Sequence, residues 1–185
     1  MTTLETSSTS AQALRRLYFI RSAFAVIWAG LLFLTSTETG PFLTVLLVIY
    51  PLFDAAAVSW QLRAAHEFPQ SRLTEQINVG ISVIVAIVLG VASGSIAAVL
   101  AVWGAWAIGS GILQFITAIG KRHSGGQVSQ MLSGGLSVIA GGAFVGQGVR
   151  DAEGLASVGG YATLGAVFFL ISAIRLSVVL RTNES

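Results

Sequence analysis

Apolar residues are concentrated in six stretches of this chain, at 17–35, 41–62, 77–92, 95–119, 128–149 and 157–180. A hydrocarbon core of about 30 Å is crossed by roughly 20 such residues in a helix. Because backbone polar groups in lipid must bond within their own segment, each stretch is expected to be helical. The pattern therefore predicts an all-α integral membrane protein with six transmembrane helices.

Polar segments of two kinds separate these stretches. Short turns join the first stretch to the second, the third to the fourth and the fifth to the sixth, whereas 63–76 and 120–127 are longer connections. We therefore expect three helical hairpins, at about 17–62, 77–119 and 128–180, in a membrane domain over 14–185. A flexible polar tail is expected over 1–13. The text GISVI at 80–84 recurs as GLSVI at 135–139, which indicates a repeated hairpin.

Basic residues between the stretches are distributed unevenly. One side carries Arg15, Arg16, Arg63, Arg72, Lys121, Arg122 and Arg181, and the other carries Arg150. Loops rich in Lys and Arg stay in the cytoplasm. The bias predicts a multi-pass protein with both termini in the cytoplasm.

Composition narrows the class of protein further. Hydrophobic residues make up 54% of the chain and charged residues 10%, against about 25% charge in soluble domains. The net charge of +2 comes from scattered groups, so no nucleic-acid-binding surface is expected. Cysteine is absent and the two histidines, His66 and His123, lie in connections. No metal site and no cofactor are therefore expected.

Several short motifs carry a family resemblance. They are Arg21 with Ser22, the segment 50–55 (YPLFDA), the segment 103–114 (WGAWAIGSGILQ) and the segment 133–137 (SGGLS). Over about 14–181 the chain resembles the HdeD family of short-repeat bacterial inner-membrane proteins. Arg21 and Asp54 match the family's charged positions, whereas Ser22 and Ala55 replace its usual glycines. The resemblance implies six spans and a role in acid or general stress tolerance.

Three ionisable residues, Arg21, Asp54 and Arg175, lie inside the predicted spans. Each costs about 2.5–3.5 kcal/mol at the centre of a bilayer, which makes this charged cluster the first functional candidate. All three fall in the cytoplasmic half, and Arg21 with Asp54 is the favoured pair. Asp54 is then either a proton-responsive carboxylate or one half of a structural ion pair that locks the first hairpin.

Polar and small residues within the spans provide two further sets of candidates. Tyr50, Asn78, Gln114 and Ser172 could form a polar path, or each could make a single interhelical hydrogen bond. Small residues four apart let helix backbones approach closely in lipid. This spacing predicts helix packing, or alternatively an oligomer contact, at three pairs: Gly90 with Gly94, Ala107 with Gly111, and Gly142 with Gly146.

Motifs for enzymatic chemistry are missing from the predicted spans. They hold no paired carboxylates, no nucleophile beside a histidine base and no phosphate-binding loop, so the chain is not expected to be an enzyme. Three functions stay open: a stress-tolerance factor, a small-solute or proton pathway centred on Asp54, and a membrane assembly subunit. The expected partner is the lipid bilayer, with a homo-oligomer or an unknown membrane protein as alternatives.

Overall fold

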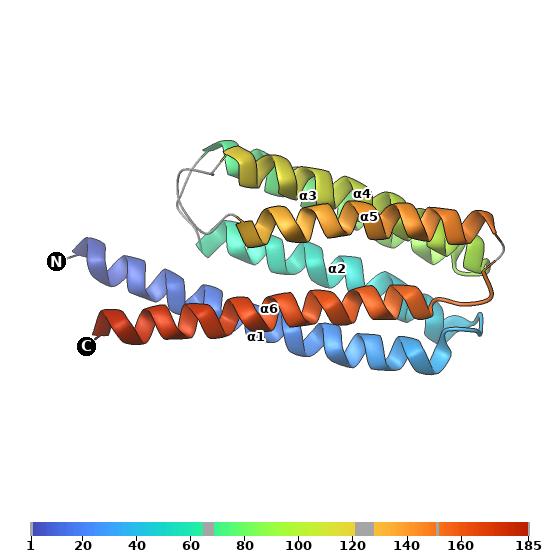
Figure 1. Cartoon of the computed structure of the whole chain (residues 1–185), viewed down its shortest axis with the longest axis horizontal. Helices are drawn as coiled ribbons and strands as arrows, with labels where there is room; N and C mark the ends of the chain where they lie inside the picture. The colour runs from blue at the N-terminus through green and yellow to red at the C-terminus, as the bar shows by residue number, and fades with distance from the viewer. Residues whose placement is uncertain (1, 65–68, 121–127, 151, 185) are drawn as a thin grey trace.

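Six long helices make up the computed structural model, which describes residues 2–64, 69–120, 128–150 and 152–184 (Figure 1). The helices are α1 (Thr2–Thr35), α2 (Pro41–Ala64), α3 (Pro69–Ala92), α4 (Ile96–Gly120), α5 (Val128–Val149) and α6 (Ala156–Glu184). Each is long and apolar enough to cross a membrane, and the described ranges contain no strand. The prediction of an all-α fold with six candidate spans is confirmed.

The helix boundaries follow local sequence rules. Pro69 opens α3 at the position where proline is tolerated best, so α3 begins there rather than at 77. The hydroxyl of Ser95 accepts a hydrogen bond from the Ala98 N–H at 3.3 Å and caps α4. The helix α1 begins at Thr2, so the segment expected to be a flexible tail is helical. No glycine or proline precedes position 30 to interrupt it.

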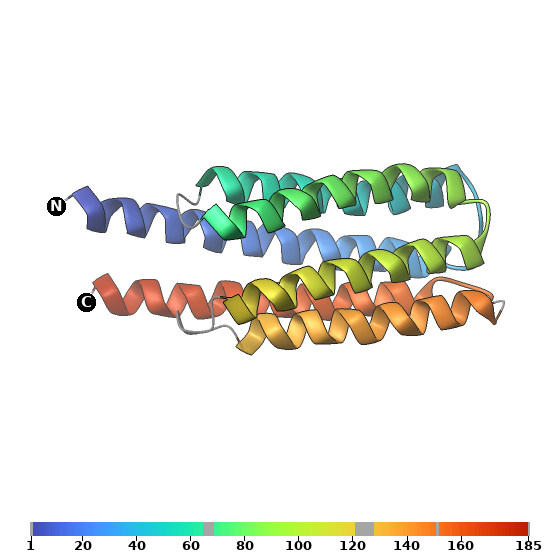
Figure 2. The ribbon, with the colours of Figure 1, turned by 90° about the horizontal axis from the view of Figure 1, so that it is seen from above.

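The six helices form a closed ring in chain order, in which α1 contacts both α2 and α6. The start of α1 and the end of α6 lie at one end of the bundle, and the turn residues 36–40, 93–95 and 152–155 lie at the other (Figures 1 and 2). Extensive and limited contacts alternate around the ring. The pairs α2–α3, α4–α5 and α6–α1 pack extensively, whereas α1–α2, α3–α4 and α5–α6 pack less.

This alternation means that the three predicted hairpins are not the closely packed units, and the hairpin repeat is not confirmed. Helices joined by a short turn are the looser pairs in each case. A turn holds two helices together at one end only, whereas extended packing needs complementary faces along their length. The closely packed pairs are those that the longer connections join, together with the pair α1–α6.

Glycine brings α4 and α5 close together. A Cβ atom on Gly104 would lie 2.6 Å from the Gly141 carbonyl oxygen, and one on Gly111 would lie 2.6 Å from the Gly134 carbonyl oxygen. A Cβ on Gly148 would lie 2.8 Å from the carbonyl oxygen of Ala97. We call these five residues, which recur every seven positions along each helix, the glycine seam: Gly104, Gly111, Gly134, Gly141 and Gly148.

The seam corrects part of the predicted helix-packing set. Gly111 belongs to it, and its predicted neighbour Ala107 is buried. A Cβ on Gly94, Gly142 or Gly146 would meet nothing within 4 Å, so these three make no close approach. Gly142 follows the seam residue Gly141 directly, and one residue rotates a helix by about 100°, which turns Gly142 away from α4.

Gly90 makes an intermediate contact. A Cβ there would lie 3.4 Å from a methyl group of Val48 on α2, which is ordinary van der Waals distance. Gly90 therefore allows α2 and α3 to pack side by side without the backbone contact found at the glycine seam.

Apolar side chains fill the half of the ring nearer the short turns. The indole rings of Trp28 and Trp103 stack with centroids 5.3 Å apart. The Trp28 Nε1–H donates to the carbonyl oxygen of Leu46 at 2.7 Å. We call the buried residues at the centre of this half the aromatic plug: Trp28, Leu47, Leu89, Trp103 and Val158.

Candidate ligand cavity

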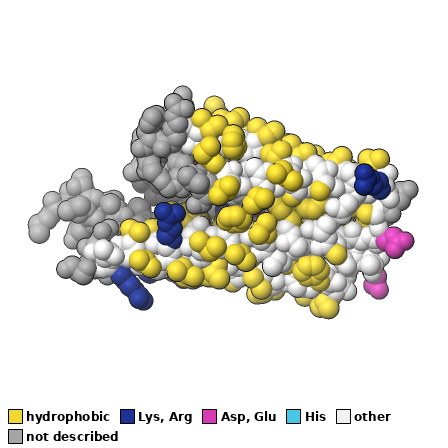
Figure 3. Space-filling model, in the orientation of Figure 1, with side chains coloured by type: hydrophobic (Ala, Val, Ile, Leu, Met, Phe, Trp, Pro, Cys, Tyr) yellow, Lys and Arg dark blue, Asp and Glu magenta, His cyan; other side chains and the backbone are white. Residues whose placement is uncertain are grey.

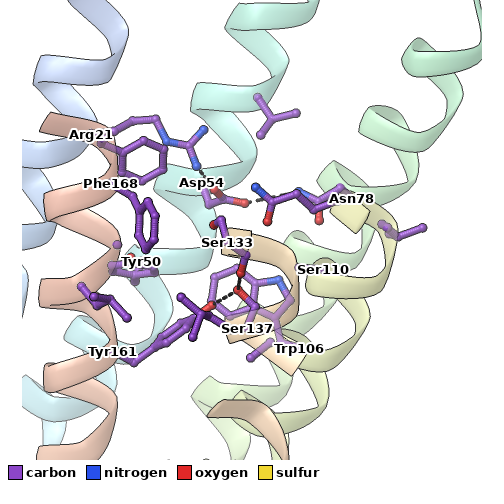
Figure 4. Close-up of a pocket in the computed structure, with 18 of the residues that line it drawn as sticks. Arg21, Tyr50, Asp54, Asn78, Trp106, Ser110, Ser133, Ser137, Tyr161 and Phe168 are labelled. Atoms are coloured by element: carbon purple, nitrogen blue, oxygen red, sulfur yellow. Dashed lines mark hydrogen bonds and ion pairs between the residues drawn. The ribbon is translucent and has the colours of Figure 1, made fainter. Parts of the chain in front are cut away.

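The other half of the ring, nearer the two termini, encloses a cavity of about 300 Å³ (Figure 4). All six helices contribute side chains to its wall. Its wall extends toward the end of the bundle where the termini lie. There it includes Gln61 on α2, Glu75 on α3 and Gln114 on α4. The cavity therefore occupies the half of the bundle that the sequence predicts to be cytoplasmic.

The favoured ion pair lies on the cavity wall. Arg21 Nη2 on α1 is 2.5 Å from Asp54 Oδ1 on α2, and the two side chains are 14% and 17% exposed. Asp54 Oδ2 also accepts hydrogen bonds from Asn78 Nδ2 at 3.4 Å and from Ser82 Oγ at 3.3 Å, both on α3. The carboxylate thus joins three helices, and both of its oxygens already accept hydrogen bonds.

An aromatic ring of α6, that of Phe169, contacts the guanidinium from the other side. The Cζ atom of Arg21 lies 4.3 Å from the ring centroid of Phe169, a cation–π distance. Tyr18, one turn earlier on α1, stacks on the same ring at 6.2 Å. The Ser22 hydroxyl donates to the Ala166 carbonyl oxygen at 2.9 Å. Arg21 is therefore fixed between α2 and α6, and the α1–α6 packing positions it.

Arg175 does not join the pair, which corrects the predicted charged cluster. Its side chain is exposed on α6 and it does not line the cavity. Arg175 lies seven residues beyond the lining residue Phe168, about 10 Å further along the helix toward the terminus. The charge of Arg175 therefore remains outside the cavity.

Three of the four predicted polar-path residues line the cavity: Tyr50, Asn78 and Gln114. Ser172 does not, because its hydroxyl donates back to the Phe168 carbonyl oxygen on its own helix at 2.8 Å. The path also does not continue through the bundle. One turn beyond Tyr50, Trp106 and Tyr161, the same helices carry Leu47, Trp103 and Val158, each 0% exposed. The aromatic plug closes the cavity at this level.

Two donors at the inner end of the cavity have no hydrogen-bond partner among the described protein atoms. They are Trp106 Nε1 and Ser110 Oγ, both buried and both on cavity-lining residues of α4. Trp106 is 8% exposed. A buried unsatisfied donor costs about 1–3 kcal/mol, so this part of the cavity is suited to a hydrogen-bond acceptor.

Sequence reasoning did not select Trp106 and Ser110 as site residues. The available signal was their spacing with Gln114, since positions 106, 110 and 114 share one face of a helix. That face carries groups able to hydrogen bond in an otherwise apolar span. A search for charged residues alone misses it, because neither side chain is ionisable in the ordinary pH range.

The fold and cavity together define a class: the six helices are consistent with a multi-pass helical membrane protein whose bundle holds a cavity lined by polar and apolar side chains. Comparison of the chain with known proteins does not narrow this class. No family model, no curated protein and no solved structure matches the chain. The two histidines of the sequence, His66 and His123, lie outside the described residues.

Proposed function

We propose that this protein is a non-enzymatic, multi-pass protein of the bacterial inner membrane that binds the polar group of a small molecule in the cavity beside Arg21 and Asp54. The observation that carries the proposal is a buried ion pair on the wall of a cavity of about 300 Å³. Charges within a membrane-spanning segment are costly. A pair that served packing alone would need no open volume beside it.

The lining supports binding rather than bond-breaking chemistry. It combines the ion pair with amides, hydroxyls and aromatic rings, and the lining residues in the described ranges include no histidine to act as a base. Such a wall can recognise a molecule by hydrogen bonds and ring contacts. The basic residues flanking this half of the bundle support an opening toward the cytoplasm.

The resemblance to the HdeD family supports the cellular role that we propose, tolerance of acid or general stress. In this proposal the protein contributes to stress tolerance when a ligand occupies the cavity. A small-solute or proton pathway through the same cavity is the second candidate, favoured by the position of Asp54. It requires the aromatic plug to move, because Leu47, Trp103 and Val158 are 0% exposed.

The test is acid survival of a deletion strain that carries wild type, Asp54→Asn, Arg21→Gln or Arg175→Gln at matched membrane abundance. We expect wild type and Arg175→Gln to rescue survival, and Asp54→Asn and Arg21→Gln to fail. Arg175→Gln is the matched control, because it removes an arginine of the same membrane half that lies outside the cavity. Failure of wild type to rescue refutes the stress role, and rescue by all four proteins refutes a functional ion pair.

Proton flux in proteoliposomes separates the second candidate from the first. Wild-type flux above that of protein-free liposomes, lost in Asp54→Asn, would establish the pathway. Flux equal to that of protein-free liposomes would leave the cavity as a binding site closed on one side.

A further inference from the structure

The cavity wall between α5 and α6 is not closed by helix packing. These two helices have the least extensive contact of the six neighbouring pairs in the ring. Leu136 on α5 and Leu164 on α6 line the cavity, yet they are 39% and 43% exposed. By comparison, the side chains of Arg21 and Asp54, which also line the cavity, are only 14% and 17% exposed. The exposure of both leucines and the limited α5–α6 contact favour a lateral entrance to the cavity between them, which we call the side opening.

The side opening lies within the membrane-spanning part of the molecule. Leu136 falls in the candidate span Met131–Val149 and Leu164 in the span Ala156–Thr182. Figure 3 faces this side, with α5 and α6 toward the viewer as in Figure 1, and hydrophobic side chains gather over both helices. Exposed apolar residues of these helices include Leu132, Ile139, Val167 and Ile171. Acyl chains of the bilayer are thus what surrounds the opening.

Lipid around the side opening suits an apolar part of a ligand, and the hydrogen-bond donors at the inner end of the cavity suit a polar part. Trp106 Nε1 and Ser110 Oγ have no protein partner and lie one helical turn apart on α4. Side chains at this spacing are about 5–6 Å apart at Cβ, so both can converge on the two oxygens of one carboxyl group. Figure 4 shows Trp106, Ser110 and Ser137 around the same part of the cavity, with Ser137 next in sequence to Leu136.

Size restricts the ligand further. A cavity of about 300 Å³ lies at the lower end of the range for small-molecule sites, so it holds a head group and part of a chain rather than a whole long-chain molecule. The rest of a long chain must stay outside, among the lipids. Because Asp54 and Arg21 already bond to each other and to α3 and α6, the open hydrogen-bonding capacity at the inner end is that of donors.

We infer that the cavity binds the carboxyl group of a long-chain monocarboxylic acid, which enters sideways from the bilayer between α5 and α6. The carboxyl oxygens accept hydrogen bonds from Trp106 Nε1 and Ser110 Oγ, and the chain leaves between Leu136 and Leu164. The inference rests on the proposed function in that it names the ligand class of the same cavity. It differs in the route, which is the lipid phase rather than the end of the bundle.

Photo-crosslinking tests the inference. The purified full chain in phosphatidylcholine nanodiscs is irradiated with palmitic acid carrying a chain diazirine, and labelled peptides are identified by mass spectrometry. We expect saturable labelling of α5 and α6 that excess palmitate removes. Ser110→Ala and Trp106→Phe should each weaken binding about fivefold to tenfold, since each loses one hydrogen bond. Trp106→Phe keeps an aromatic ring in the wall, and Ser110→Ala changes a single oxygen.

Variants at the opening provide the matched control. Leu136→Trp should block labelling by filling the side opening, whereas Ile139→Trp, 71% exposed on the same helix and not in the cavity wall, should not. Labelling that is uniform, or unaffected by Leu136→Trp and by both donor variants, overturns the inference. Labelling by a diazirine phosphatidylcholine that palmitate does not displace also overturns it, because the occupant is then a diacyl lipid.

Butyrate separates failure of this inference from failure of the proposed function. It carries the same carboxyl group without a long chain. Thermal stabilisation of the protein by butyrate, lost in Ser110→Ala and unaffected by Leu136→Trp, would preserve the cavity as a binding site but refute entry from the bilayer. Stabilisation by palmitate alone supports the inference.

Discussion

Helix α5 has two neighbours, and it meets them in opposite ways. Against α4 it packs through the glycine seam, where backbone lies on backbone. Against α6 it is held by side chains: the Tyr161 hydroxyl donates to Ser137 Oγ at 2.8 Å, and the rings of Phe144 and Tyr161 meet edge to face at 5.6 Å. Lipid supplies no hydrophobic force between helices, so close backbone packing is what holds them. We therefore call the α4–α5 interface the fixed boundary and the α5–α6 interface the adjustable boundary.

The largest effect is expected from breaking the fixed boundary. A Cβ on Gly141 would lie 2.6 Å from the Gly104 carbonyl oxygen and 2.9 Å from the Ile108 nitrogen. Because backbone cannot move aside as a side chain can, Gly141→Leu should prevent α4–α5 packing and leave little monodisperse protein by size-exclusion chromatography. The adjacent Gly142→Leu, which points into open space, should fold. Equal loss in both variants would show that the seam does not determine stability.

A smaller effect is expected at the wall opposite the side opening. Asp54→Ala leaves Arg21 without its partner and removes the acceptor for Asn78 and Ser82. Breaking a buried ion pair lowers the unfolding free energy by about 3–5 kcal/mol. We expect a loss near the lower end of this range for Asp54→Ala, because both side chains of the pair line the cavity and are partly exposed. Asp54→Asn keeps the shape and one acceptor oxygen and should lose about half as much. Unfolding by SDS titration measures both, and identical values would argue against a role of the ion pair in stability.

The adjustable boundary should respond less. Tyr161→Phe removes the hydroxyl hydrogen bond that joins α6 to Ser137 on α5 and should lower the unfolding free energy by about 1 kcal/mol. It should also speed labelling of an introduced Leu136→Cys by a lipophilic maleimide, in a chain that has no other cysteine. Thr163→Val is the control, since the Thr163 hydroxyl bonds to Gly159 on its own helix. Equal labelling rates in the two variants would contradict an opening held by Tyr161.

The smallest effect is expected at Arg175. Its exposed side chain lies outside the cavity, so Arg175→Gln should change the unfolding free energy by less than about 0.5 kcal/mol. Arg21→Gln should cost clearly more in the same SDS titration. A large loss in Arg175→Gln would mean that α6 depends on this charge.

The features that could be predicted from the sequence are those determined by the surrounding lipid and by the cost of placing a charge in it. The long apolar stretches identified the six helices, with α2 expected at 41–62 and found at Pro41–Ala64. The penalty for intramembrane charge selected Arg21 and Asp54 as a pair. Which helices are neighbours depends instead on faces meeting in space. The search for small residues four apart therefore missed the sevenfold spacing of Gly134 and Gly141.

The position of α6 beside α1 has a consequence for biosynthesis. Tyr18, Arg21 and Ser22 on α1 contact Phe169 and Ala166 on α6, which emerges from the ribosome well over a hundred residues later. During insertion, α1 must remain in the membrane with this polar face uncovered by its final neighbour. A chaperone or insertase that shelters the face until α6 arrives would therefore act on the first helix throughout synthesis.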